Sequence, residues 1–189
     1  MVPLIWMAVT LTIWTASPVV RDLDGRLRHP FAPAGRASVL IFLTSDCPIS
    51  NTYASEIQDV CRTSAPAGVE CLLVYEDPGI TPAAARAHLA AYRYSGLPAA
   101  IDADGAVARA AGASVTPEAV VIDAAGAARY RGRIDNLFVG LGRRRAAATV
   151  HDLRDAIAAL LAGRPIARPR TEAFGCYITR SADRSQESR

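Results

Sequence analysis

The sequence predicts an α/β fold with a central mixed β-sheet, helices on both faces of that sheet and an N-terminal β-hairpin. Two continuous apolar runs, over 38–43 and 68–75, carry this prediction. Strands that are apolar at every position are buried on both faces, which is typical of the parallel part of a sheet. A helical pattern follows each run, and a later hairpin pattern adds antiparallel strands. The first crossover should therefore be parallel and right-handed.

The first half of the chain is expected to form a hairpin, a strand and a helix. The turn Asp22–Arg26 separates two short extended pieces, at 18–21 and 26–29. The strand over 38–43 leads into a helix over about 48–63, because apolar residues recur there at helical spacing. The apolar face of that helix consists of Tyr53, Ile57, Val60 and Cys61.

The second half is expected to contain two longer helices and a hairpin. Thr81 can cap a helix that begins at Pro82 and ends before Gly96. The final helix should begin near Thr149, with Asp152 three residues later as an approximate capping box. The other expected elements are a strand at 99–101, one or two helical turns before Gly112, and hairpin strands at 118–123 and 127–133.

Length and composition indicate one globular domain. The chain has 189 residues, of which 51% are hydrophobic and 21% charged, enough for a full core. The formal net charge is only +3, and all 21 cationic side chains are arginines. They are scattered, apart from Arg143-Arg144-Arg145, which we interpret as a solvated loop. Nucleic-acid binding would require a clustered basic face, so we do not expect it.

The chain divides into three segments. Residues 1–17 are expected to be a signal peptide or an N-terminal anchor, because the first twenty residues carry no ionisable side chain and small residues follow the apolar stretch. No positive charge precedes that stretch, which leaves a membrane tether open as the alternative. The domain should span 18–163, and 164–189 should form a C-terminal tail that carries Cys176. We therefore expect an exported protein, periplasmic or extracellular.

Cys47 lies where the buried strand gives way to a helix, followed by Pro48 at a position that a first helical turn accepts. Free backbone N–H groups at a helix start stabilise a negative charge. Such surroundings can lower the pKa of a cysteine from about 8.5 to roughly 3.5–7.5, and the thiolate is the reactive form. This placement predicts redox chemistry at Cys47.

The other three cysteines have less informative surroundings. Cys61 lies on a helix face and Cys71 in a buried strand, so we expect inert core thiols, which can pair only if that helix packs over that strand. Cys176, in the tail, is either an exposed thiol or linker, or a resolving cysteine that reaches Cys47. There is no Cys-x-x-Cys motif and the three histidines are far apart, so no metal is expected.

Several motifs together carry a family resemblance. They are the Asp-x-x-Gly-Arg hairpin, Thr44-Ser45-Asp46-Cys47-Pro48, Ser114-Val115-Thr116-Pro117, Ile122-Asp123-x-x-Gly126, and Gly175-Cys176-Tyr177-Ile178. With these, the chain resembles the thioredoxin-fold redoxins, in the peroxiredoxin-like (AhpC/TSA-like) thiol–disulfide oxidoreductase group, including a subgroup with a Gly-Cys-x-Ile tail. The resemblance covers about 18–178 and implies a thioredoxin-like fold.

The resemblance also implies residue roles. Cys47 becomes the nucleophile and Cys176 a resolving cysteine, while Thr44 matches the threonine of the peroxiredoxin motif. Ser50 stands where thioredoxins have a second cysteine, and it either completes the helix turn or donates a hydrogen bond to the thiolate. Thr116 and Pro117 should form a cis-proline turn that binds an extended, thiol-bearing substrate.

Two function classes follow. In the first, the chain is a thiol-dependent oxidoreductase in which the Cys47 thiolate attacks a disulfide or a peroxide and Cys176 or an external thiol resolves the product. In the second, it is a non-catalytic module that binds a partner segment at Thr116 and Pro117. The expected partners are a thiol- or disulfide-bearing protein or a peroxide, with an unidentified electron donor. No organic cofactor is expected, because no glycine-rich phosphate loop is present.

Overall fold

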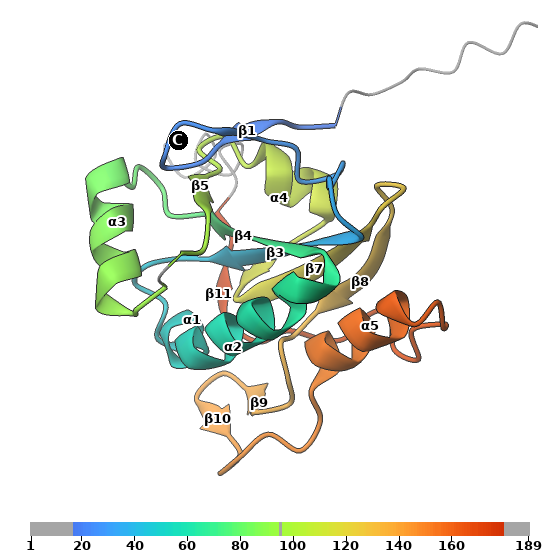
Figure 1. Ribbon diagram of the computed structural model, residues 1–189. Helices are drawn as coiled ribbons and strands as arrows, with labels where there is room; N and C mark the ends of the chain where they lie inside the picture. Colours follow the sequence, from blue (N-terminus) through green and yellow to red (C-terminus); the bar gives the residue numbers. More distant parts are fainter. Residues whose placement is uncertain (1–16, 95, 180–189) are drawn as a thin grey trace, which may run out of the picture.

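The computed structural model describes residues 17–94 and 96–179. Its centre is a five-stranded sheet in the order β5-β4-β3-β7-β8 (Figure 1). The sheet strands are β3 (Ala37–Leu43), β4 (Val69–Tyr75), β5 (Ala99–Ile101), β7 (Glu118–Asp123) and β8 (Ala128–Gly132). The helices are α1 (Pro48–Thr52), α2 (Ala54–Ser64), the 3₁₀ turn η1 (Ala65–Ala67), α3 (Pro82–Ala91), α4 (Ala106–Ala111) and α5 (Asp152–Leu161). The short outer strands are β1 (Val20–Arg21), β2 (Leu27–Arg28), β6 (Val115–Thr116), β9 (Phe138–Gly140), β10 (Arg143–Arg144) and β11 (Cys176–Tyr177).

The sheet is mixed, as predicted. β3 pairs in parallel with β4 and antiparallel with β7, and β4 pairs in parallel with β5. All seven residues of β3 are buried because helices cover both faces of this central strand. β1 and β2 form the predicted antiparallel N-terminal pair, closed by Asp22, whose Oδ1 accepts hydrogen bonds from the backbone N–H groups of Asp24 and Arg26.

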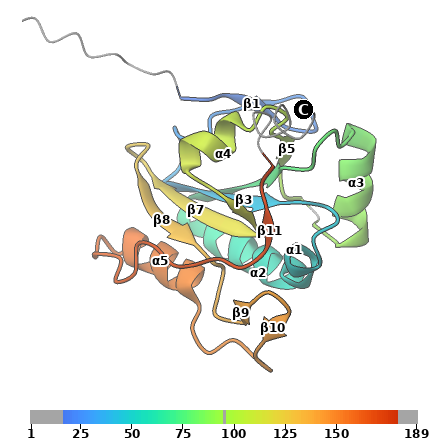
Figure 2. The same ribbon diagram turned by 180° about the vertical axis from the view of Figure 1, so that it is seen from behind.

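α4 lies on one face of the sheet, and α2 and α5 lie on the other (Figure 2). An apolar cluster fills each of these two sides. The larger cluster packs side chains of α2, α3 and α5, such as Ile57, Ala85 and Leu153, against alternate positions of β3 and β4. The smaller cluster packs Val107 and Ala108 of α4 against the other positions. The alternation along a strand therefore sends side chains into both layers.

The predicted helix over 48–63 is interrupted. α1 ends at Thr52 and α2 begins at Ala54, with Tyr53 between them at ψ 0°. The Tyr53 hydroxyl donates to the buried carboxylate of Asp135 over 2.6 Å, and its ring packs against Phe138. These long-range contacts hold the residue at the junction, and local sequence does not encode them.

The predicted cap of the last helix is wrong. α5 begins at Asp152, and its N-cap His151 makes no side-chain capping bond. The Thr149 hydroxyl accepts instead from Asn136, and the Asp152 carboxylate forms ion pairs with Arg133 and Arg168. The side chains that the local pattern predicts as caps of this helix therefore bind residues that are distant in sequence.

Beyond α5 the chain returns along the sheet. The backbone N–H of Arg131 donates to the carbonyl of Pro169, and the N–H of Thr171 donates to the carbonyl of Arg131. β11 then pairs antiparallel with β6, with Cys176 opposite Thr116 and Tyr177 opposite Val115. This pairing carries residue 176 to the carboxyl end of β3.

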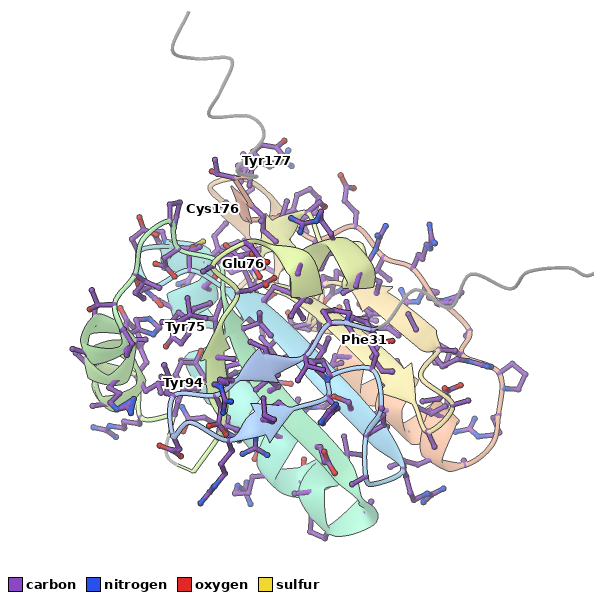
Figure 3. All side chains as sticks on the ribbon, turned by 90° about the horizontal axis from the view of Figure 1, so that it is seen from above. Phe31, Tyr75, Glu76, Tyr94, Cys176 and Tyr177 are labelled. Atoms are coloured by element: carbon purple, nitrogen blue, oxygen red, sulfur yellow. A yellow bond between two sulfur atoms is a disulfide. The ribbon has the colours of Figure 1, made fainter. Side chains whose placement is uncertain are left out.

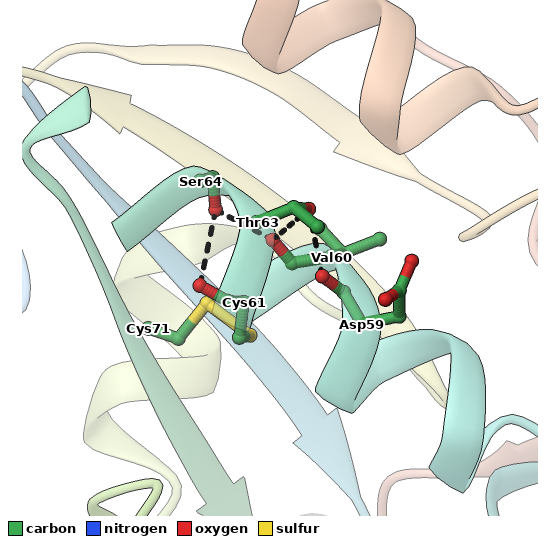
Figure 4. The surroundings of a disulfide bond; sticks show 6 residues. All are labelled: Asp59, Val60, Cys61, Thr63, Ser64 and Cys71. Atoms are coloured by element: carbon green, nitrogen blue, oxygen red, sulfur yellow. Dashed lines mark hydrogen bonds between the residues drawn. A yellow bond between two sulfur atoms is a disulfide. The ribbon is translucent and has the colours of Figure 1, made fainter. Parts of the chain in front are cut away.

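Cys61 and Cys71 form a disulfide, with Cα atoms 5.8 Å apart (Figure 4). The expectation that they are inert core thiols is therefore wrong. α2 packs directly over β4 and brings the two side chains together, which is the condition that the sequence left open. Within 17–94 and 96–179, no helix is both long and apolar enough to cross a membrane. The expected signal peptide or anchor lies almost wholly outside these residues.

Candidate active site at Cys47

Cys47 is the N-cap residue of α1, immediately after β3 and the turn Thr44–Asp46. Its backbone N–H donates to the Thr44 carbonyl over 3.3 Å, and its own carbonyl accepts from the Asn51 N–H. The residue is 0% exposed. The strand-to-helix position predicted for Cys47 is therefore confirmed, and the structure adds that the side chain is covered.

Polar side chains form hydrogen bonds with the turn before Cys47. The Asp77 carboxylate accepts from both the backbone N–H and the hydroxyl of Ser45, over 2.8 and 2.5 Å. The amide of Asn51 donates to the Ser45 carbonyl over 3.0 Å, and its oxygen lies 2.8 Å from Nε2 of the buried His88. Local sequence patterns did not reveal Asn51 and His88 as supports of this turn, because His88 arrives from α3.

Cys176 covers Cys47. The two Sγ atoms, 129 residues apart in sequence, lie 2.8 Å from each other and are not bonded. The Cys47 thiol also donates to the Thr116 carbonyl over 3.3 Å. A disulfide requires about 2.05 Å between sulfurs, so bond formation needs a movement of less than about 1 Å. We refer to Cys47 and Cys176 as the cysteine pair.

Backbone pairing holds Cys176 in place, and Gly175 permits it. The backbone N–H of Ile178 donates to the Ser114 carbonyl over 3.0 Å, which extends the β6–β11 pairing. A β-carbon at position 175 would overlap the carbonyl oxygen of Thr116. Only glycine lets the tail backbone approach β6 this closely. Cys176 itself is exposed, and Tyr177 beside it is 80% exposed (Figure 3).

The pKa values of the two thiols are shifted in opposite directions. Burial would raise the pKa of Cys47, but the hydrogen bond from the Cys176 thiol outweighs it, with a further contribution from the nearby backbone N–H and hydroxyl of Ser50, and the pKa of Cys47 is lowered. Although Cys176 is exposed as a residue, its sulfur is partly desolvated against Cys47. This desolvation, the hydrogen bond to Cys47 with its negative charge, and the charge of Asp46 raise the pKa of Cys176 to about 12. Cys47 is therefore the thiol that ionises first.

The structure brings the other predicted site residues around the pair. Ser50 is buried, and its hydroxyl has no hydrogen-bond partner among the described residues, so it is free to donate to the Cys47 thiolate. Thr44 does not bond to the sulfur: its hydroxyl lies 3.1 Å from that of Thr116. The Thr116–Pro117 peptide bond is cis, as predicted.

Among the acidic residues near this end of the sheet, Glu76 is buried, whereas Asp46 is exposed. Glu76 is 7% exposed, at the same end of the molecule as Cys176 (Figure 3). Burial, together with the nearby charge of Asp102, raises the pKa of Glu76 to about 9. Glu76 is therefore protonated at neutral pH, and it adds no negative charge close to the cysteine pair.

One cluster offers three groups of the types that bind metal ions. Side-chain atoms of Glu56, Asp135 and His151 lie within 4.8 Å of one another. Arg154 holds both carboxylate oxygens of Glu56, over 2.7 and 2.9 Å, and Asp135 accepts from Tyr53. Because these oxygens already have strong partners, the cluster is a hydrogen-bonded network of the fold.

Comparison with known proteins identifies the family. The model of the AhpC/TSA family matches residues 23–131, which is more than half of the chain and includes β3 and Cys47. The chain belongs to the AhpC/TSA family, within the thioredoxin-fold redoxins. A comparison with curated proteins found no significant match.

Solved structures share the fold. A hypothetical protein from Sinorhizobium meliloti 1021 is 25% identical with a TM-score of 0.75, and the match covers 93% of this chain and 97% of that one. An uncharacterized conserved protein from Geobacillus kaustophilus is 22% identical with a TM-score of 0.72, over 87% and 90% of the two chains. A secreted disulfide oxidoreductase from Mycobacterium tuberculosis is 18% identical with a TM-score of 0.53, over 78% and 96%. These matches establish a thioredoxin-like fold, and membership of the AhpC/TSA family supports a redoxin-type thiol oxidoreductase.

Proposed function

We propose that the chain is an exported thiol–disulfide oxidoreductase whose cysteine pair cycles between dithiol and disulfide. One observation carries the proposal: the sulfurs of Cys47 and Cys176 lie 2.8 Å apart although 129 residues separate them. Backbone pairing between β6 and β11 produces this contact. Cys47 has the lowered pKa of a nucleophile, and Cys176 has the raised pKa of a thiol held in reserve.

The first step is attack by the Cys47 thiolate on one sulfur of a partner disulfide. That S–S bond breaks, one partner sulfur leaves as a thiolate, and a mixed disulfide with Cys47 forms. Cys47 is 0% exposed beneath the tail, so β11 must separate from β6 before a polypeptide disulfide can reach it. A strand held by two residue pairs can open in this way at low cost.

The second step releases the partner. Cys47 in the mixed disulfide no longer carries a negative charge, so one cause of the raised pKa of Cys176 disappears. Cys176 loses its proton and attacks the Cys47 sulfur, and the second partner sulfur leaves as a thiolate. Two electrons pass from the cysteine pair to the partner, and the pair becomes a disulfide.

Export is part of the proposal. The Cys61–Cys71 disulfide supports it, because structural disulfides persist mainly in oxidising compartments. The apolar stretch in the N-terminal sequence supports it as well. Solved neighbours include a secreted disulfide oxidoreductase and an exposed pneumococcal lipoprotein thioredoxin.

Turnover assays on three proteins test the proposal. The wild type, Cys47→Ser and Cys176→Ser are assayed in parallel for reduction of insulin disulfides and of hydrogen peroxide, with dithiothreitol as reductant. The proposal predicts disulfide turnover by the wild type and none by Cys47→Ser. It also predicts that Cys176→Ser, mixed with insulin in the absence of dithiothreitol, accumulates a mixed disulfide on Cys47. Peroxide turnover alone would replace the disulfide substrate with a peroxide, and no turnover at all would favour a binding module.

A further inference from the structure

An apolar pocket of about 390 Å³ adjoins the cysteine pair on the side of Cys176. It is lined by α1, by the β9–β10 hairpin with Leu141 and Arg144, and by Cys176 of the tail. Cys47 is not part of its lining. The pocket therefore reaches one sulfur of the pair and not the other.

The hairpin side of this pocket has an unusual surface. Leu141 at the hairpin tip is 64% exposed, although large apolar side chains are normally buried. Arg143 and Arg144 are exposed, and neither forms an ion pair within residues 17–94 and 96–179. An apolar hollow edged by the unpaired Arg144 is complementary to a segment that has an apolar side chain and a carboxylate.

We propose that this pocket is the docking site of the dithiol polypeptide that re-reduces the chain, and that its thiolate attacks Cys176 rather than Cys47. The attacking cysteine of that partner would have an apolar and an acidic neighbour, seated against Leu141 and Arg144. The inference rests on the proposed function, because it concerns the disulfide form of the cysteine pair.

Exposure and leaving-group chemistry both favour attack on the Cys176 sulfur. Cys176 is exposed and borders the pocket, whereas Cys47 is 0% exposed. Attack on Cys176 expels Cys47, whose lowered pKa makes it the better leaving thiolate. Attack on Cys47 would expel Cys176, whose raised pKa makes it the poorer one.

The exchange balances in two steps. The partner thiolate bonds to the Cys176 sulfur, the Cys47–Cys176 bond breaks, and Cys47 leaves as a thiolate. The second partner thiol, after loss of its proton, attacks the first partner sulfur, and Cys176 leaves as a thiolate that takes up a proton. The partner ends as a disulfide, and two electrons have moved to the cysteine pair.

Two synthetic peptides serve as probes: acetyl-Glu-Leu-Cys-Gly-amide and acetyl-Lys-Ser-Cys-Gly-amide. Each is mixed with the oxidised full chain, the reaction is stopped with acid within seconds, and peptide mapping locates the mixed disulfide. Rates are compared for the wild type, Arg144→Glu, and Arg26→Glu. The last variant carries the same charge change in the N-terminal hairpin, at the opposite end of the molecule (Figure 1).

The proposal predicts an adduct on Cys176. It also predicts that Arg144→Glu slows the reaction of the Glu-Leu peptide about fivefold, because reversal of an exposed charge contact is worth about 1 kcal/mol. Arg26→Glu should not slow this peptide, and neither change should slow the Lys-Ser peptide. An adduct on Cys47, or equal rates in all three proteins, would overturn the docking proposal. Failure of the cysteine pair to form a disulfide at all would instead overturn the proposed function.

Discussion

The hydrogen bond between the two sulfurs makes a quantitative prediction about the acidity of Cys47. The Cys176 thiol donates to Cys47, and this bond is the main cause that offsets the burial of the thiolate. We expect the pKa of Cys47 to be higher in Cys176→Ala, which lacks a donor, than in Cys176→Ser, which keeps a hydroxyl donor. Backbone pairing holds the tail in both variants, so burial of Cys47 is matched.

The size of the difference follows from the strength of one bond. A hydrogen bond to a charged group is worth about 1.5–3 kcal/mol, and one pKa unit corresponds to about 1.36 kcal/mol. Because Cys176 is exposed, solvent weakens the bond and the lower end of that range applies. The pKa of Cys47 should therefore be about 1 unit higher in Cys176→Ala than in Cys176→Ser.

Alkylation by iodoacetamide measures this pKa. In either variant Cys47 is the single free thiol, because Cys61 and Cys71 are bonded to each other. The rate is followed by mass spectrometry from pH 5 to pH 10, and its midpoint gives the pKa. Coincident midpoints for the two variants would refute the assignment of Cys176 as the donor.

Three further outcomes are expected. Gly175→Ala places a β-carbon on the Thr116 carbonyl, at a steric cost of about 1–3 kcal/mol. The equilibrium constant for forming the Cys47–Cys176 disulfide in a glutathione buffer should therefore fall roughly 5–150-fold, and an unchanged constant would contradict this. Glu76 is protonated in the folded chain between its ordinary pKa near 4.5 and about 9 but ionised when unfolded, so stability should fall as the pH rises through that window. Glu76→Gln should flatten this dependence in urea unfolding and add at least about 1 kcal/mol at pH 7, and a persistent slope would count against it. Replacing Cys61 and Cys71 by serine should lower the free energy of unfolding by about 3 kcal/mol, the value for a short closed loop, with alkylation of the remaining pair unaltered.

Much of the fold could be predicted from the sequence because its signals are local and continuous. The apolar runs over 38–43 and 68–75 became β3 and β4, and the strand at 99–101 became β5 at the predicted bounds. Thr81 caps α3 as expected, since its hydroxyl accepts from the Ala84 N–H over 3.1 Å. Apolar runs, turn residues and capping hydroxyls all lie within a few residues of the element that they specify.

The features that were missed depend on tertiary contacts. Nothing near Arg143–Arg145 indicates that this triplet lies on a hairpin beside a pocket, because that pocket is assembled from α1, the hairpin and the tail. Asp77 and His88 support the turn before Cys47 from other elements of the fold. Residues far apart in sequence meet only when the sheet is assembled.

The two cysteines of the candidate site could be predicted from the sequence, but the contacts around them could not. Cys47 could be found because a strand followed by Cys-Pro has a physical meaning, and the family resemblance pointed to Cys176. The close approach at Gly175 could not be found, because glycine in a tail is compatible with many conformations. Its significance appears only when the Thr116 carbonyl is seen beside it.

Peptide mapping after mild oxidation tests the central claim most directly. The purified chain is treated with one equivalent of diamide, digested without reduction and analysed by mass spectrometry. The account predicts a new peptide that joins Cys47 to Cys176 within one molecule, beside the unchanged Cys61–Cys71 link. A Cys47 that remains free, or that bonds only to a second molecule, would contradict it.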